Sequence, residues 1–262
     1  MKGYIKEEFK RAIFSRNTLI AVVLCFICIT LNFTYTNKGF YIRNKNAATT
    51  FLLIFRGKYS ILLLTFASLI ASLPYAASYA IDAKNGFVKD VYTRMSRKKY
   101  FLVKYFVNGI VGGAVLALCL LITLAILLII FRGSPIKPFT GQDIFTGAFE
   151  YFYNNNLLIY SFICILMLFG YGFIFSTLGL SIAVLTENMY LSLFFPLLFP
   201  IIITMLFGGG EIGHYLSVEM IFYPMNFAYS TEGQFFIAEG IWLSFVTILY
   251  FIGSVRKVII NE

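Results

Sequence analysis

The sequence predicts an all-α polytopic membrane protein with six transmembrane helices. Three observations carry this prediction: 60% of the 262 residues are hydrophobic and only 13% are charged, the mean hydropathy is +0.83, and six long segments lack Asp, Glu, Lys and Arg. Soluble domains contain about 25% charged residues, so this chain has too little polar surface to face water on every side. The composition also excludes a disordered chain, and four cysteines are too few for a disulfide-stapled secreted domain.

Each apolar segment approaches or exceeds the roughly 20 residues that a helix needs to cross the hydrocarbon core. Pro74, Pro196 and Pro200 fall inside these segments. We expect kinks there rather than failed spans, because neighbouring helices can satisfy the freed carbonyls. The first segment is too long for a signal peptide and no Ala-x-Ala-type site follows it, so we expect a mature span. The predicted spans are residues 18–36, 59–81, 105–131, 157–186, 189–207 and 240–255.

The distribution of basic residues predicts the orientation, because short loops rich in Lys and Arg tend to stay in the cytoplasm. With the N-terminus inside, the cytoplasmic side receives five basic residues from the N-terminal tail, seven from residues 82–104 and two after residue 255; seven fall outside. We therefore expect a multi-pass protein of the plasma membrane with both termini cytoplasmic. The net charge of +9 gathers at the membrane borders, which favours membrane lipids over nucleic acid as its partner.

The ionisable residues form no pattern typical of catalysis or metal binding. His214 is the single histidine, so the chain offers no Ser-His-Asp group and no H-E-x-x-H helix. We expect no catalytic residue and no metal ligand. The predicted spans lack charged residues, which weighs against an ion-coupled pump. The cysteines lie within predicted spans, where we expect small packing residues: Cys25, Cys28, Cys119 and Cys164.

Residues 82–99 predict a short amphipathic helix between spans two and three. Asp82 and Asn85 can supply capping oxygens near its start, and Gly86 allows a sharp turn out of span two. The apolar face of this helix could lie among lipid acyl chains or insert into a groove on a soluble partner, and composition does not decide between the two. That face comprises Phe87, Val88, Val91, Tyr92 and Met95, while Lys89, Asp90, Thr93, Arg94 and Ser96 lie opposite.

Residues 1–17 predict a second amphipathic helix, at the N-terminus. Ile5, Phe9, Ala12 and Ile13 share its apolar face, and charged side chains take the other. We expect this helix to lie on the inner leaflet before the chain turns into span one.

With these two helices and six spans, the chain resembles the membrane subunit, or permease, of ATP-binding-cassette exporters of the second export class. The resemblance covers essentially the whole chain, so residues 1–262 would form a single permease domain, with residues 1–17 as an elbow helix and residues 82–99 as the coupling-helix loop. It is carried by Asp82, Asn85-Gly86, the amphipathic turn, Ser96-Arg97 and the basic Lys104 before span three.

The sequence also departs from the family pattern at two positions. Asp82 stands where glutamate is more familiar, and no proline precedes Ser96. These differences weaken the assignment to a subfamily but leave the geometry of the loop intact. The loop between spans four and five is too short for a second large docking helix, in agreement with the family pattern.

The resemblance implies export of an amphipathic or lipophilic substrate, such as a peptide, an antibiotic or a lipid-linked molecule. ATP and Mg²⁺ would bind in a partner ATPase, because this chain has no G-x-x-x-x-G-K-[ST] loop to cradle phosphate. Residues 208–235 would form short re-entrant helices at the exit, or else an acidic solvated loop. The expected contacts with the ATPase are Gly86, Phe87, Val88, Val91, Tyr92, Arg94 and Met95.

The resemblance also implies a second permease, identical or different, beside this one. Gly109 and Gly113 form a G-x-x-x-G motif, and Gly172, Ser176 and Gly179 line span four with small residues. Such residues allow helices to approach closely, either between two permeases or within one chain.

Two other functions remain open from the sequence. A secondary transporter would work without an ATPase, although the two halves of the chain show no convincing repeat. An immunity or sensor protein of the membrane could share the fold and bind a toxic peptide or a partner without exporting anything.

Overall fold

The computed structural model describes residues 2–39, 46–53, 55, 60–136, 147–207, 218, 222 and 230–260, which form helices and turns with no strand among them. Within these described residues, five helices are long and apolar enough to cross a membrane: α2 (Arg16–Gly39), α7 (Arg97–Ile130), α9 (Leu157–Thr186), α10 (Met189–Phe207) and α13 (Glu232–Ile260). The chain is therefore a multi-pass, all-helical membrane protein. The shorter helices are α1 (Lys2–Ile13), α3 (Ala47–Leu53), α4 (Ser60–Ser72), α5 (Ser78–Lys84), α6 (Phe87–Tyr92) and α8 (Glu150–Asn155).

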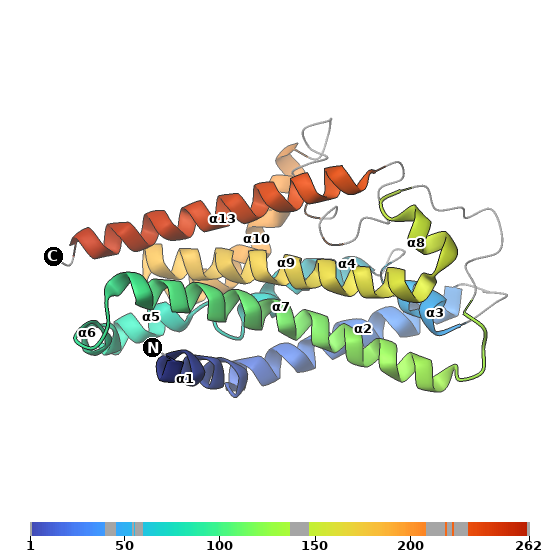
Figure 1. The fold of residues 1–262 in the computed structure, drawn as a ribbon, viewed down its shortest axis with the longest axis horizontal. Coiled ribbons are helices and arrows are strands. Elements are labelled where there is room, and N and C mark those ends of the chain that lie inside the picture. The colour runs from blue at the N-terminus through green and yellow to red at the C-terminus, as the bar shows by residue number, and fades with distance from the viewer. Residues whose placement is uncertain are drawn as a thin grey trace.

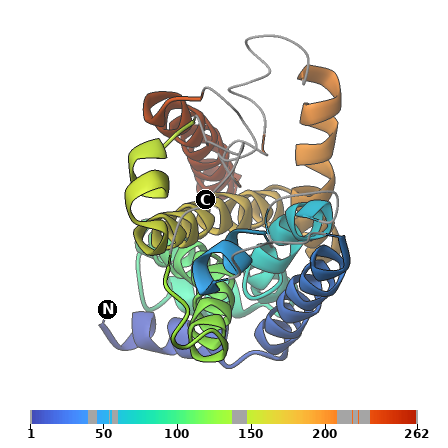
Figure 2. The same ribbon diagram turned by 90° about the vertical axis from the view of Figure 1, so that its right-hand side faces the viewer.

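The helices form an elongated bundle around α9. In Figure 1, α2, α7, α9 and α13 run along the long axis; α6 and the C-terminus lie toward one end, with the N-terminus nearer to them than to α3 and α8 at the other end. The end-on view in Figure 2 places α9 in the middle, where it contacts α7, α13, α10 and α4. We call the end that carries α6 and the C-terminus the α6 end.

The second predicted span is interrupted at Pro74. Helix α4 ends at Ser72, residues 73–77 form turns, and α5 begins at Ser78. The prediction of a mere kink was wrong here, because proline lacks an N–H donor and also disfavours helical geometry in the residue before it. Helix α10, by contrast, continues through both Pro196 and Pro200, so the prediction that these prolines leave the helix intact is confirmed.

Two other spans are longer than predicted. Helix α7 begins at Arg97 rather than near residue 105, and α13 begins at Glu232 rather than near residue 240. These extensions bring Lys104 into α7 and Glu239 into α13, each just outside the charge-free segment that was predicted.

Small residues bring α7 and α9 close together within one chain. A Cβ atom at Gly112 of α7 would lie 2.7 Å from the carbonyl oxygen of Ala71 and closer still to Ser176, and a Cβ at Gly172 would lie 2.8 Å from the carbonyl oxygen of Gly112. Neither position has room for a side chain. The other predicted small residues also face neighbours in this chain: Gly109 meets Phe173, Gly113 meets Phe169, and Gly179 meets Ser192 and Ala76.

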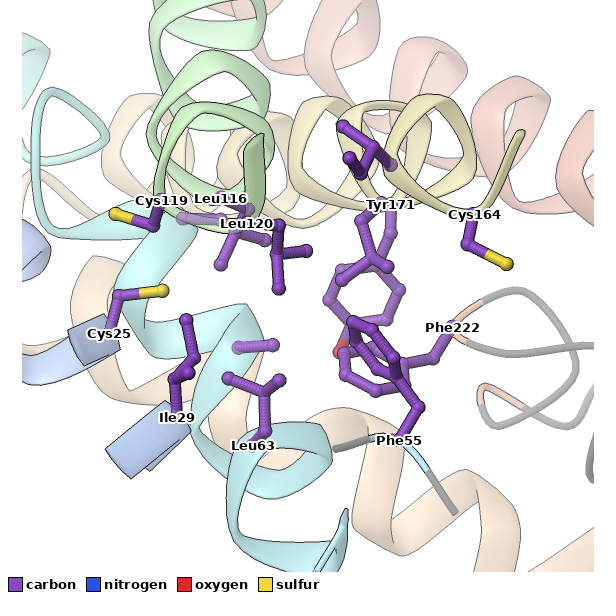
Figure 3. Close-up of a cluster of buried hydrophobic side chains, with 14 of the residues drawn as sticks. Cys25, Ile29, Phe55, Leu63, Leu116, Cys119, Leu120, Cys164, Tyr171 and Phe222 are labelled. Carbon is purple, nitrogen blue, oxygen red and sulfur yellow. The ribbon is translucent and has the colours of Figure 1, made fainter. Parts of the chain in front are cut away.

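The largest buried apolar cluster joins α2, α3, α4, α7, α9 and α13 (Figure 3). In this view Cys25 of α2 and Cys119 of α7 lie on facing helices, and Tyr171 of α9 lies beside Phe55 and Phe222. The rings of Tyr171 and Phe222 are 5.2 Å apart. All four cysteines are free and buried, as expected for packing residues.

Most of the predicted external segment, residues 208–235, lies outside the described residues, as does His214. Within it the structure describes Val218 and Phe222, which are buried in this apolar cluster, and residues 230–235.

Candidate functional site

The site begins with the sharp turn between α5 and α6. Gly86 adopts a φ of 75°, a left-handed conformation that costs other residues energy, and the predicted turn at this glycine is confirmed. Helix α6 then covers only six residues, shorter than the predicted stretch to Met95. The predicted capping was wrong: no side chain caps α6, and Asp82 faces the opposite way, into the protein.

The apolar face of α6 packs on its own chain. Val88 and Val91 are buried in a cluster with Tyr79 and Tyr100, and Tyr92 and Met95 pack against the same cluster. This face therefore covers the ends of α5 and α7 instead of lying in lipid or in a partner's groove, the two alternatives that the sequence left open. A single sequence shows that a helix is amphipathic. It does not show whether the apolar face packs against the same chain, a partner protein or lipid.

The outward side of α6 carries a mixed apolar and charged surface. The Phe87 side chain is 41% exposed, and Lys89, Asp90 and Arg94 are exposed around it. A hollow of about 570 Å³ opens beside this surface. It is lined by Tyr4 of α1 and by Phe87, Asp90, Val91, Arg94, Met95, Ser96 and Lys99.

Directly behind α6 lies a buried ionic cluster, made by Glu8, Arg11, Asp82 and Lys104. The Nζ atom of Lys104 lies 2.7 Å from Oδ2 of Asp82 and 3.3 Å from Oε2 of Glu8. The Nη2 atom of Arg11 donates to Oδ1 of Asp82 over 2.7 Å. Lys104 is fully buried, and Asp82 and Glu8 are 1% and 3% exposed. The buried Lys104 and the partly exposed Arg11 thus balance two buried carboxylates, which removes most of the cost of burying each charge alone.

Two tyrosines complete the hydrogen bonding of the ionic cluster. Lys104 donates from Nζ to the Tyr75 hydroxyl over 2.8 Å, and that hydroxyl donates in turn to Glu8. Tyr100 donates its hydroxyl to Asp82 over 3.3 Å. The Nζ atom also lies 4.6 Å from the centre of the Tyr75 ring and 5.6 Å from that of Tyr100, within range of cation–π attraction.

The ionic cluster reaches the outward side of α6 through Arg11. Its guanidinium carbon lies 5.9 Å from the centre of the Phe87 ring, while its Nη2 atom holds Asp82. Burial lowers the pKa of Arg11, but the hydrogen bond and charge of Asp82 outweigh burial and raise this pKa above its ordinary value. Arg11 therefore stays charged and links α1, α5 and α6.

Helix α1 lies against α7 through most of its predicted apolar face, together with Glu8. Glu8 and Ala12 are buried at its centre, against Val103, Val107 and other residues. Of the predicted apolar face, Ile5 and Phe9 are half-buried at the rim and Ile13 is 50% exposed. Ala12 was part of the predicted apolar face, whereas the burial of Glu8 beside it was not predicted.

A separate cavity lies within the bundle, between α4, α9 and α10. Its volume is about 310 Å³, and hydroxyl groups of Thr65, Ser68, Tyr171 and Thr204 interrupt a mostly apolar wall. Helix α10 beside it leaves most of its surface uncovered: Phe194, Leu198, Ile202 and Met205 are each at least half exposed. No group of three metal-ligating side chains occurs among the described residues.

The comparisons found no family model, no curated protein and no solved structure that matches this chain.

Proposed function

We propose that this chain is the permease subunit of an ATP-driven exporter of the second export class. In this proposal α2, α4 with α5, α7, α9, α10 and α13 make six crossings, and the α6 end faces the cytoplasm. Helix α1 is then the elbow helix and α6 the coupling helix. Both chain ends lie nearer the α6 end than the end that carries α3 and α8 (Figure 1). A chain whose two ends lie on the same side crosses the membrane an even number of times, which supports six crossings.

One observation carries the proposal: the contacts that join the exposed Phe87 to three helices behind it. Phe87 of α6 lies under Arg11 of α1, Arg11 holds Asp82 of α5, and Asp82 holds Lys104 of α7. A force applied to α6 would therefore move the inner ends of α4–α5 and α7 together with α1. A coupling element needs this property, because it must turn the motion of a partner into a rearrangement of membrane helices.

The docking surface would be the outward side of α6 and the hollow beside it. Because Val88 and Val91 serve the chain's own core, we assign the contact with the ATPase to Phe87, Asp90, Arg94 and Lys99. This surface presents an exposed aromatic ring among charges of both signs, the composition that is common at energetically important positions of protein interfaces. The ATPase would bind ATP and Mg²⁺ and supply the free energy.

The translocation path would lie where α4 and α10 face a second permease. The cavity lined by Tyr171 and Pro200 lies on that side, and the uncovered apolar face of α10 is large enough to meet another membrane helix. The mostly apolar wall with scattered hydroxyls suits an amphipathic or lipophilic cargo.

The proposal is tested by purifying the tagged chain from its native membrane and measuring ATP hydrolysis in the eluate. Phe87→Ala removes the exposed ring, and loss of an interface aromatic of this kind costs about 2 kcal/mol or more, so we expect co-purified activity to fall about thirtyfold. Ile129→Ala, at a position 74% exposed at the far end of α7, is the matched control. Equal activity in both variants and the wild type, or no ATPase in any eluate, would refute the coupling role.

A second candidate, a cation-coupled transporter without an ATPase, is favoured by one observation. Glu239 lies in the membrane-spanning helix α13, where an ionisable group is rare and commonly marks an ion or substrate pathway. Cation-driven uptake or efflux by the isolated chain in vesicles without ATP would favour this candidate over the exporter.

A further inference from the structure

The carboxylate of Glu239 occupies a notch in the backbone of α9. Gly170 forms the notch: a Cβ atom at this position would collide with Oε1 of Glu239, and the nearest atoms around it all belong to that glutamate. Glycine therefore provides the space that the carboxylate fills. The contact holds one carboxylate oxygen against the central helix of the bundle.

This contact lies between two apolar helices. Gly170 is close to the midpoint of α9, which runs from Leu157 to Thr186, and Glu239 lies within the apolar helix α13. An ionised carboxylate among apolar helices is costly unless a positive charge or hydrogen-bond donors compensate it, and otherwise the group takes up a proton. The glutamate side chain is half-buried, so one side of it remains open to whatever surrounds the bundle.

The other two buried acidic groups show how this chain compensates such a charge. Asp82 pairs with both Lys104 and Arg11, and Glu8 pairs with Lys104 and accepts from Tyr75. Glu239 has neither an ion pair nor a hydrogen bond to any other described residue. The compensating positive charge at this position is therefore absent from the described part of the chain.

The surroundings of Glu239 are apolar and aromatic. Phe236, one helical turn away, is 59% exposed, and its ring lies 5.4 Å from that of Phe235. Leu243, one turn in the other direction, is 38% exposed. A ligand that satisfies this surface must therefore combine a positive charge with a hydrophobic body.

We propose that Glu239, seated in the Gly170 notch, binds the positively charged group of a hydrophobic organic cation that reaches it from the membrane. As an assignment of cargo class this rests on the proposed export function, whereas the binding site itself rests only on the geometry of α9 and α13. The ligand chemistry is that of a substituted ammonium or phosphonium with apolar groups around the charge.

The test is equilibrium binding to the purified chain of tetraphenylphosphonium and of tetraphenylborate, which have nearly the same size and hydrophobicity but opposite charge. We expect saturable binding of the cation only. Glu239→Gln keeps the shape and removes the charge, so we expect its affinity for tetraphenylphosphonium to fall at least about tenfold. Glu7→Gln, at an exposed glutamate of α1, is the matched control and should bind like the wild type.

Two further measurements make the result decisive. Gly170→Ala keeps the glutamate but fills the notch, and we expect it also to weaken binding of the cation. The elution volume of this variant in size-exclusion chromatography and its thermal unfolding curve show whether it is folded. Equal binding of both ions by the wild type, or unchanged cation affinity in Glu239→Gln, would overturn the proposal. Because the assay contains neither ATP nor an ATPase, its outcome is independent of the co-purification experiment: either hypothesis can fail alone.

Discussion

The Nζ atom of Lys104 lies 2.7 Å from Oδ2 of Asp82, and the lysine side chain is completely buried. Asp82 belongs to α5 and Lys104 to α7, so this ion pair closes the turn that carries α6. Glu8 of α1 joins the same ammonium group. The position of α6 therefore depends on charges that three helices bring together in the interior.

Removal of the central ammonium should destabilise the chain strongly. Lys104→Met keeps the apolar stem but leaves Glu8 and Asp82 with only Arg11 as a nearby cation. Loss of one partner from a buried ion pair costs about 3–5 kcal/mol, and we expect a loss of this size in the free energy of unfolding in detergent. Lys98→Met, at an exposed position of the same helix, should unfold like the wild type. Equal stability of the two variants would show that the ionic cluster does not hold α6 in place.

The two faces of α6 should respond differently to substitution. Val91→Asp places an unpaired charge in the cluster around Tyr79 and Tyr100, so we expect poor folding, with a loss of several kcal/mol. Phe87→Ala changes an exposed side chain, and we expect its free energy of unfolding to stay within about 1 kcal/mol of the wild type. Thermal unfolding of both purified variants checks this difference. A Phe87→Ala chain as unstable as Val91→Asp would contradict the division of α6 into a core side and an outward side.

The left-handed turn at Gly86 gives a further prediction. Alanine at this φ of 75° should cost roughly 1–2 kcal/mol of stability, and asparagine should cost less because its side chain tolerates this conformation. Gly3→Ala, in a helix with no neighbour near its Cβ position, should be neutral or slightly stabilising. Unfolding curves of the three variants give the ranking; equal stability of Gly86→Ala and the wild type would argue against the turn.

Helix packing around α9 can be tested with a pair of glycines. A Cβ at Gly112 would press on Ser176 and on the carbonyl of Ala71, whereas a Cβ at Gly240 meets nothing within 4 Å. We expect Gly112→Ala to lose about 1–3 kcal/mol through overpacking and Gly240→Ala to be neutral or to gain up to about 1 kcal/mol in helix propensity. Reversal of this order in unfolding experiments would mean that α7 and α9 do not meet as described.

Local features were largely predictable from the sequence. Gly86 was predicted correctly because a chain that must reverse sharply after a membrane span needs a residue free to adopt positive φ. The existence of the long apolar helices was predictable because crossing a bilayer sets their minimum length, although α7 and α13 extend beyond it. The break at Pro74 was not predictable. Helix α10 continues through Pro196 and Pro200, so proline alone does not decide between a continuous and an interrupted helix.

Features that depend on distant partners were not predictable. Glu8 and Lys104 are 96 residues apart, and each alone resembles an ordinary charge at a membrane border. Asp82 was expected to cap a helix, yet its ion pairs with the buried Lys104 and with Arg11 direct its carboxylate inward. Val88 and Val91 were correctly placed on an apolar face, but only the fold reveals that this face covers Tyr79 and Tyr100.

Glu239 was missed for a different reason. The sixth span was predicted as a segment without charged residues. Such a segment cannot begin before Gly240, so it excludes Glu239. The helix itself continues to Glu232, because helical hydrogen bonding does not stop at an ionisable residue.

Photo-cross-linking from position 87 tests the central claim most directly. A photoreactive phenylalanine analogue replaces Phe87 in the tagged chain, and light is applied in intact native membranes before purification. We predict a cross-linked protein whose tryptic peptides include a G-x-x-x-x-G-K-[ST] loop, and no such product from the same analogue at Ile129. Cross-links from position 87 to phospholipid alone, or to a protein without a nucleotide-binding loop, would contradict the account.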